Sequence, residues 1–152
     1  MKVNRRKFLT TSLAMGAAGM GLLESSFASA EWLAADFAPG SFDATMKQLL
    51  NGKPIVETDK IELTIPEIAE NGALVPVTVS SSLKDIRRIA IVVEQNPVPL
   101  AIEAELMQEL ELFMSARLKL AGTSFVFAIA ETDKVCYSVK KKVKVTIGGC
   151  GG

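Results

Sequence analysis

Beyond residue 60, apolar and polar side chains alternate along most of the chain, and this period of two constrains the fold more than any other feature. Successive side chains of a β-strand point to opposite faces of a sheet, so alternation is typical of strands with one buried face. Val75, Val77 and Val79, for example, are separated by Pro76 and Thr78. The pattern predicts seven strands, at residues 61–65, 75–80, 86–93, 100–107, 110–120, 124–130 and 135–147.

Seven strands joined by short turns are typical of a β-sandwich. The pairs Asn71-Gly72, Asn96-Pro97 and Ala121-Gly122 supply turn signals between them. We therefore expect residues 31–147 to form one all-β domain, an immunoglobulin-like antiparallel β-sandwich. The Cys…Trp…Cys signature of true immunoglobulins is missing, because Trp32 lies outside the predicted strands. Pro76 lacks a backbone N–H, which predicts a sheet edge or a bulge at that point.

One short helix is expected before the strands. Phe42, Met46, Leu49 and Leu50 recur at helical spacing. Ser41 can cap the start of this helix, and the Asn51-Gly52 pair can end it.

The first thirty residues have the pattern of an export signal. Residues 4–10 read NRRKFLT, with paired arginines Arg5 and Arg6, and an apolar stretch follows at 11–23 before the small residues at 28–30. This order is that of a signal peptide, and the paired arginines indicate the bacterial twin-arginine (Tat) route. The apolar stretch is too short for a membrane anchor, which needs about 20 apolar residues. We therefore expect a Tat leader at residues 1–30 and a periplasmic mature protein that begins at Glu31.

Charge and composition exclude several classes of function. The predicted leader holds four of the seventeen basic residues and one of the seventeen acidic residues, so the remainder carries thirteen against sixteen, a net charge of minus three. Such a balance gives no reason to expect nucleic-acid binding. The chain has no histidine and only two, widely separated cysteines, which argues against Ser-His or Cys-His catalysis and against a metal site.

The acidic residues near position 105 and the first cysteine are interpreted without a role in function. Glu103, Glu105, Glu109 and Glu111 recur at the spacing of a strand's polar face, so we interpret them as a solvated face and not as a catalytic pair. Cys136 alternates with Val135 and Tyr137 in the last predicted strand and should face away from them. We interpret Cys136 as a free or partly buried thiol, too far along an extended strand to form a disulfide with Cys150.

The last five residues, Gly148-Gly149-Cys150-Gly151-Gly152, suit a mobile arm with one reactive atom. Glycine visits both signs of φ, and nothing in this segment except the sulfur can be buried. The alternative to a functional arm is a disordered terminus that contains a cysteine by chance. The lysines at 140–144 are interpreted as a solvated face of the last strand. They would offset the effect of the Gly152 carboxylate on the thiol only if the arm folded back, and the sequence leaves this open.

Residues 143–152, VKVTIGGCGG, resemble the C-terminus of the SoxY family, the sulfur-carrier subunits of the bacterial thiosulfate-oxidising Sox system. The lysine-rich stretch 140–144, the Asn96-Pro97 break and the twin-arginine leader are also similar to that family. The resemblance extends loosely over the whole mature chain and closely over its final segment.

The resemblance implies a covalent carrier acted on by other enzymes, with no catalytic residues, metal or cofactor of its own. Cys150 would be the attachment site for thiosulfate-derived sulfur, and Gly148, Gly149, Gly151 and Gly152 would form the arm. The implied partners are a SoxZ-like subunit in a heterodimer, a SoxAX-like c-type cytochrome that loads thiosulfate, and a SoxB-like hydrolase that releases sulfate. A sulfur dehydrogenase would oxidise the remaining persulfide, or the sulfur would pass into storage.

Two other functions fit a terminal cysteine among glycines. One is a carrier that holds sulfur as a thiocarboxylate at Gly152, although such carriers are adenylated by a cytosolic partner, which does not suit an exported chain. The other is an exported binding domain that pairs through Cys150 in an intermolecular disulfide.

Overall fold

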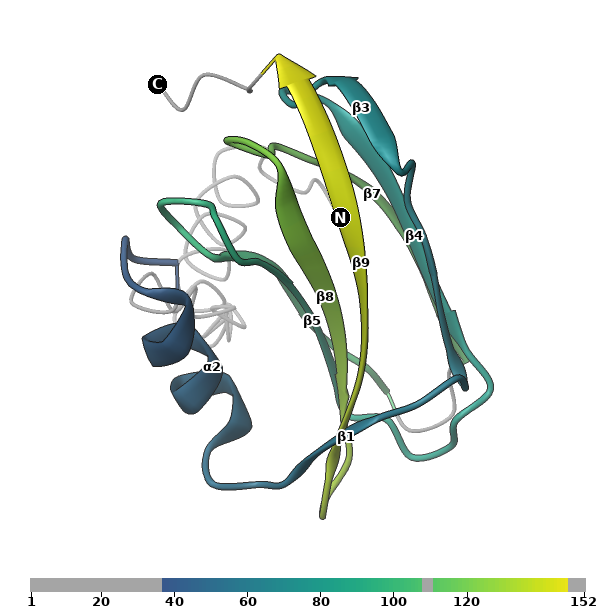
Figure 1. Ribbon diagram of the computed structural model, residues 1–152. Coiled ribbons are helices and arrows are strands. Elements are labelled where there is room, and N and C mark those ends of the chain that lie inside the picture. The colour runs from purple at the N-terminus through teal and green to yellow at the C-terminus, as the bar shows by residue number, and fades with distance from the viewer. Residues whose placement is uncertain (1–36, 108–110, 148–152) are drawn as a thin grey trace, which may run out of the picture. The chain divides into compact units, whose positions relative to one another are not determined.

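The computed structural model describes residues 37–107 and 111–147. The elements in chain order are one helix, α2 (Phe42–Leu50), and nine strands in the described residues (Figure 1): β1 (Ile55–Glu57), β2 (Ile61–Thr64), β3 (Ile68–Asn71), β4 (Val75–Ser81), β5 (Arg88–Val93), β6 (Leu100–Glu105), β7 (Leu112–Leu118), β8 (Ser124–Glu131) and β9 (Cys136–Ile147). The expected leader at 1–30 lies outside the described residues, as does the expected arm at 148–152.

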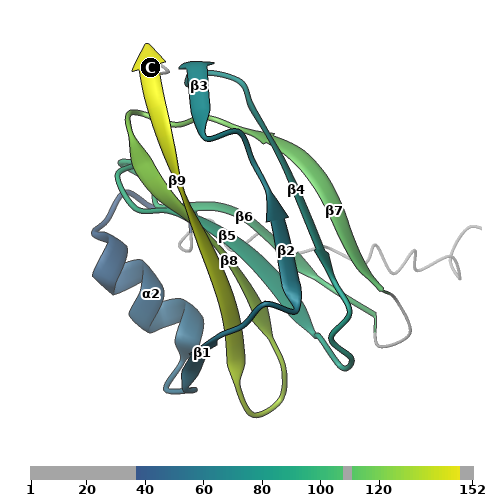
Figure 2. The same ribbon diagram turned by 45° about the vertical axis from the view of Figure 1, so that its right-hand side comes forward.

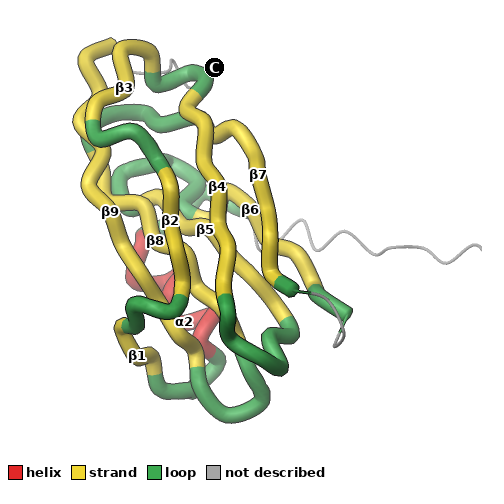
Figure 3. Tube along the Cα trace, turned by 90° about the vertical axis from the view of Figure 1, so that its right-hand side faces the viewer, coloured by secondary structure: helices red, strands yellow, loops and turns green. Residues whose placement is uncertain are grey.

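The strands form two sheets. The larger sheet has the order β1-β9-β8-β5-β6, with β3 also paired to β9, and the smaller sheet has the order β2-β4-β7. Figure 2 shows the two sheets as layers, and Figure 3 shows the smaller sheet toward the viewer with α2 behind the larger one. The chain is therefore a mostly β, immunoglobulin-like sandwich with one short helix, as the sequence predicts.

Alternation in the strands produces the core between the sheets. Val75, Val77 and Val79 of β4 are each at most 1 % exposed and pack in the core between the sheets, while Pro76 faces outward. The larger sheet contributes the odd-numbered residues of β5, including Ile91, to the same core. Burial of this apolar surface is the main source of stability for such a sandwich.

Strand β5 is buried on both faces, which explains its continuous apolar sequence. Its even-numbered residues Ala90 and Val92 pack in a second cluster that includes Leu49 of α2. The rings of Phe42 and Phe127 lie 5.0 Å apart in the same layer. Helix α2 therefore covers the outer face of the larger sheet (Figure 1).

The caps of α2 are those that the sequence predicts. The backbone N–H of Ala44 donates to the Ser41 hydroxyl at 3.2 Å, and Asn51 adopts the left-handed conformation with φ 45° at the C-terminal end. Gly52 follows with φ 79°, a value that a residue with a Cβ rarely adopts.

Two strands were missed, and they make the sandwich partly parallel. The sequence predicts seven of the nine strands, and the two additional ones, β1 and β3, both pair in parallel with β9 while the other strand pairs in the described residues are antiparallel. These strands have only three and four residues, too few to show a period of two. Backbone pairing with β9 defines them, so tertiary structure and not local pattern produces them.

The sequence predicts a sheet edge or a bulge at Pro76, and the structure has an edge there, although only locally. Strand β4 is central in its sheet, but β2 pairs only with Thr78–Ser81. Pro76 pairs with Arg117 of β7 and has no β2 residue on its other side. The side of Pro76 away from β7 is therefore a local edge of the sheet, a position that tolerates proline.

In the described part of the chain, no helix is both long enough and apolar enough to cross a membrane.

Candidate functional site

Cys150 and the four arm glycines lie outside the described residues, and the structure shows what comes immediately before them. Strand β9 continues beyond its ladder with β8. The final pair of that antiparallel ladder joins Ser124, the first residue of β8, to Val143 of β9. From Lys144 to Ile147 it is held by β3 in parallel register. Gly72 donates its N–H to the Ile147 carbonyl at 2.8 Å, and the Thr146 hydroxyl donates to the Glu70 carbonyl at 2.8 Å. The arm therefore begins at a backbone that is held in place up to its last described residue.

A groove with a basic lining lies beside this end of β9. It has a volume of about 650 Å³. We call it the basic groove, and its lining consists of Ile65, Glu67, Ile68, Thr123, Lys141, Lys142 and Lys144. The lining contains three lysines and one carboxylate, so the groove is suited to an anionic or acidic group. The sequence indicated the lysines but not Thr123, which precedes the neighbouring strand β8, nor Glu67 and Ile68, which come from a segment far away in the chain.

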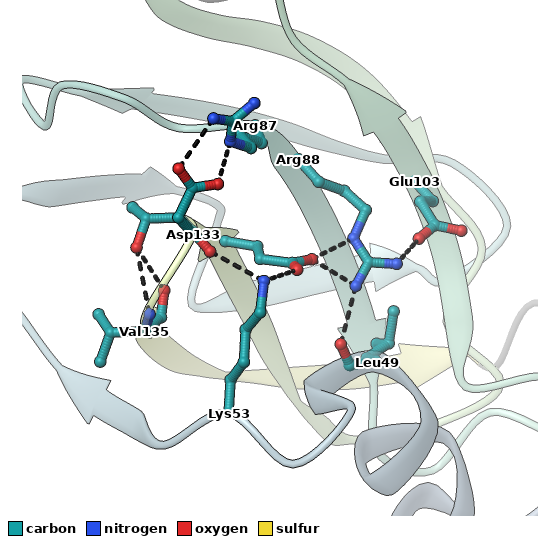
Figure 4. Close-up of polar contacts among 9 residues, drawn as sticks. Leu49, Lys53, Arg87, Arg88, Glu103, Asp133 and Val135 are labelled. Atoms are coloured by element: carbon teal, nitrogen blue, oxygen red, sulfur yellow. Dashed lines mark hydrogen bonds and ion pairs between the residues drawn. The ribbon is translucent and has the colours of Figure 1, made fainter.

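An ion-pair cluster joins α2 to the larger sheet near the other end of the sandwich. Arg88 of β5 donates to Glu103 of β6 at 2.5 Å, to Glu131 of β8, and to the Leu49 carbonyl of α2 at 2.8 Å (Figure 4). Lys53 donates to Glu131 at 2.5 Å. The four charged side chains are only 16–27 % exposed, so water screens them weakly.

The cluster changes the ionisation of Glu131. Burial opposes its charge, but the hydrogen bond from Lys53 and the charge of Arg88 outweigh that cost and lower the pKa of Glu131 below its usual value of 4.5. The cluster corrects the interpretation of Glu103, which pairs with Arg88 and is not part of a solvated face. Glu105 and Glu111 are exposed as predicted, and Glu109 lies outside the described residues.

Cys136 is a buried, free thiol, as the sequence predicts. It is 1 % exposed in the layer beneath α2, while Tyr137 and Val139 pack toward the core between the sheets. Burial raises the pKa of the Cys136 thiol, and the nearby Glu131 carboxylate raises it further. Because the thiolate is the nucleophile, this cysteine is poorly suited to carry a substrate.

No cluster of three or more potential metal ligands occurs among residues 37–107 and 111–147. The described structure is a β-sandwich whose last strand extends past its neighbour beside a basic groove and ends three residues before Cys150 in the sequence. This defines the class as an immunoglobulin-like β-sandwich whose last strand extends past its neighbour.

Comparison with known proteins identifies the family. The model of the family described as "Sulfur oxidation protein SoxY" matches residues 46–150, which includes Cys150. The sulfur carrier protein SoxY from Chlorobium limicola f thiosulfatophilum is similar in structure, with a TM-score of 0.64, 31 % sequence identity, and coverage of 69 % of this chain and 96 % of that chain. The chain belongs to the SoxY family of sulfur oxidation proteins, as its terminal motif indicates.

Other comparisons add little. A superoxide reductase (neelaredoxin) from Ignicoccus hospitalis matches with a TM-score of 0.47, 19 % identity, and coverage of 58 % of this chain and 81 % of that chain, which is too distant to bear on function. No curated protein sequence matches the chain significantly.

The ion-pair cluster leads to a prediction about stability. Replacing Arg88 with methionine should lower the free energy of unfolding by about 2–3 kcal/mol, because Glu103 and the Leu49 carbonyl lose a buried donor and Glu131 keeps only Lys53. Chemical denaturation followed by circular dichroism measures the change. Arg87→Met is the matched control, because Arg87 pairs with Asp133 at the surface, and it should shift the midpoint little.

The same cluster predicts the acid dependence of stability. A lowered pKa in the folded state gives Glu131 a stabilising contribution that is present above about pH 4.5 and is lost as the pH falls through the folded value. Arg88→Met should reduce this acid-dependent loss. Equal destabilisation by the two arginine substitutions, with identical pH profiles, would contradict the assignment of the cluster.

Proposed function

We propose that this chain is the sulfur carrier of a thiosulfate-oxidising system and that Cys150 is its attachment site. The observation that carries the proposal is the family match, which runs through residue 150 and so includes the single cysteine of the terminal segment. The described structure supports it in two ways. The backbone is held up to Ile147, three residues before this cysteine, and the other cysteine is buried with a raised pKa.

The proposed chemistry begins with an oxidation. The Cys150 thiolate and thiosulfate join through a new S–S bond to give Cys–S–S–SO₃⁻, and the two electrons released pass to a SoxAX-like c-type cytochrome. A SoxB-like hydrolase then adds water across the S–SO₃ bond, which releases sulfate and two protons and leaves the persulfide Cys–S–S⁻. The persulfide is oxidised by a sulfur dehydrogenase or passed into storage. The carrier itself supplies the thiol and its position, and partner enzymes perform each reaction.

Tethering explains why a carrier is useful here. An intermediate bound to the protein cannot diffuse away, and each partner meets it at a high effective concentration. The glycines on both sides of Cys150 leave the segment without side chains that would block a narrow channel. We propose that the chain acts in the periplasm after Tat export of residues 31–152, where c-type cytochromes and thiosulfate are available to it.

We also propose that the chain works as a heterodimer with a SoxZ-like subunit. Strands β6 and β7 lie at the edges of their sheets in the described residues. The side chain of Phe113, on β7, is 73 % exposed, and that of Met107, next to β6, is 78 % exposed. Open edges and exposed apolar side chains are features that a partner subunit can cover. A second β-sandwich docked there would leave the end of β9 free.

The two cysteines should differ completely in loading. Cys150→Ser should abolish the gain in mass when the carrier is incubated with thiosulfate and the loading cytochrome, because the remaining cysteine of the sequence, Cys136, is buried. Cys136→Ser should load normally, since its thiol is buried and poorly ionised. Intact-protein mass spectrometry measures both. Loss of loading in Cys136→Ser protein that remains folded would show that the two thiols have been assigned the wrong roles.

The glycines should matter to enzymes and not to small reagents. Gly149→Val and Gly151→Val should each slow enzymatic loading and unloading, because a β-branched side chain stiffens and widens the segment. The free energy of unfolding should change by less than about 0.5 kcal/mol, as is usual for surface substitutions. Alkylation of Cys150 by iodoacetamide should proceed at nearly the wild-type rate, since open solvent imposes no channel.

The experiment depends on comparing the enzymatic rates of the valine variants with their rates of alkylation by iodoacetamide. If the valine variants slow the enzymes and the small reagent equally, the glycines tune the reactivity of the thiol, and the narrow-channel explanation fails.

A further inference from the structure

The reach of the terminal segment limits where a partner enzyme can touch this protein. Cys150 follows Ile147 by three residues, so its Cα lies at most about 11 Å from the Cα of Ile147 even when the segment is fully extended. An enzyme that reacts with Cys150 inside its own active site must therefore bring its surface close to the end of β9. The length of the terminal segment therefore determines which part of the protein surface a partner enzyme can contact.

Exposed basic, apolar and acidic residues lie near that end of the strand, and Glu67 and Glu70 are the acidic ones beside Lys144 and Thr146. Lys144 lies three residues before Ile147, about 10 Å back along the strand. Ile147 is 69 % exposed, and Ile68, the register partner of Lys144, is 60 % exposed. The basic groove opens beside them with Lys141 and Lys142. Exposed apolar side chains next to charged ones are common in protein–protein interfaces.

The groove lysines are not neutralised within the described part of the chain. Lys140, four residues before Lys144, forms an ion pair with Glu57 at 2.8 Å. The structure shows no such pair for Lys141, Lys142 or Lys144 in the described residues, and Lys142 lies over the ring of Phe125 at 5.7 Å. Glu67 is the one carboxylate in the groove lining. Like charges held close together favour the approach of an opposite charge.

Neither β1 nor β3 pairs with the middle of β9, and the basic groove lies beside this stretch, close to the end of β9. β1 pairs with β9 as far as Ser138, and β3 pairs with it from Lys144 onward. Between these pairings the chain leaves the larger sheet to form β2 and then returns (Figure 2). Glu67 and Ile68 lie on the returning segment, which explains how residues more than 70 positions apart in sequence line one groove with Lys141–Lys144.

We propose that the basic groove, through Lys142 and Lys144 of its lining, is the docking surface for the enzymes that act on the terminal cysteine, and that these enzymes carry acidic side chains around the entrance to their active sites. Complementary charge would speed the encounter and align the tether with the entrance. The inference rests on the proposed carrier function for the identity of the reaction, but the surface follows from the reach of the tether and from the charge of the groove.

The test loads the carrier without any loading enzyme. Tetrathionate reacts with the Cys150 thiolate to give Cys–S–S–SO₃⁻ and thiosulfate, so no electron acceptor is needed. The heterodimeric carrier, purified with its partner subunit and loaded in this way, is then the substrate of the SoxB-like hydrolase from the same cells. Sulfate release is measured while carrier concentration and ionic strength are varied.

The double variant Lys142→Glu/Lys144→Glu should lose at least about tenfold in kcat/KM at low salt, through a higher KM for the carrier, and the wild-type value should fall as salt is added. Lys134→Glu is the matched control, because it makes the same kind of charge reversal on an exposed lysine at the opposite end of β9. It should change kcat/KM by less than about twofold, since distant exposed charges are screened. Iodoacetamide should alkylate the unloaded thiol of every variant at a similar rate.

The outcomes separate the two proposals. If loaded wild-type carrier releases no sulfate, the proposed carrier function fails. If wild-type carrier reacts but the double variant reacts as fast, or if Lys134→Glu is impaired to the same degree, the docking surface is wrong. The milder pair Lys142→Gln/Lys144→Gln should give an intermediate loss, and circular dichroism of each variant establishes that it is folded.

Discussion

The pairing of β9 with its neighbours is the interaction on which the rest of this structure depends. Over twelve residues β9 forms an antiparallel ladder with β8 and parallel ladders with β1 and β3. Its side chains contribute to both apolar layers, Val143 to the core between the sheets and Cys136 to the layer under α2. Shortening or displacing this strand would disturb both layers and would also move the point at which the terminal segment begins.

This arrangement combines a fixed origin with a short tether. β3 and the turn after it hold the last four residues of β9 through backbone hydrogen bonds, after the ladder with β8 has ended. A carrier needs its reactive atom to reach other enzymes and also needs to be aligned by them. In our proposal, the hydrogen-bonded end of β9 and the basic groove beside it supply the alignment, and the glycine-flanked cysteine supplies the reach. We propose that function depends on the contrast between the two parts.

Much of the fold could be predicted because it depends on local sequence patterns. Alternating residues such as Val75, Val77 and Val79 predict strands with one buried face, and Ser41 and Asn51 predict the ends of the helix. The short strands β1 and β3 could not be predicted, because their pairing depends on where the distant β9 lies. The same limit applies to the site. The terminal motif singles out Cys150, whereas the joining of Glu67, Ile68 and Thr123 to the lysines, and of Glu103 to Arg88, arises only in three dimensions.

The central claim is that sulfur is held covalently on Cys150, and the C-terminal peptide of carrier isolated from cells that are oxidising thiosulfate tests it most directly. Fragmentation mass spectrometry locates any added mass within this peptide. The account predicts one added sulfur atom or a thiosulfonate group on the sulfur of Cys150. Modification of the Gly152 carboxylate, or a peptide found only as a Cys150–Cys150 disulfide, would contradict it.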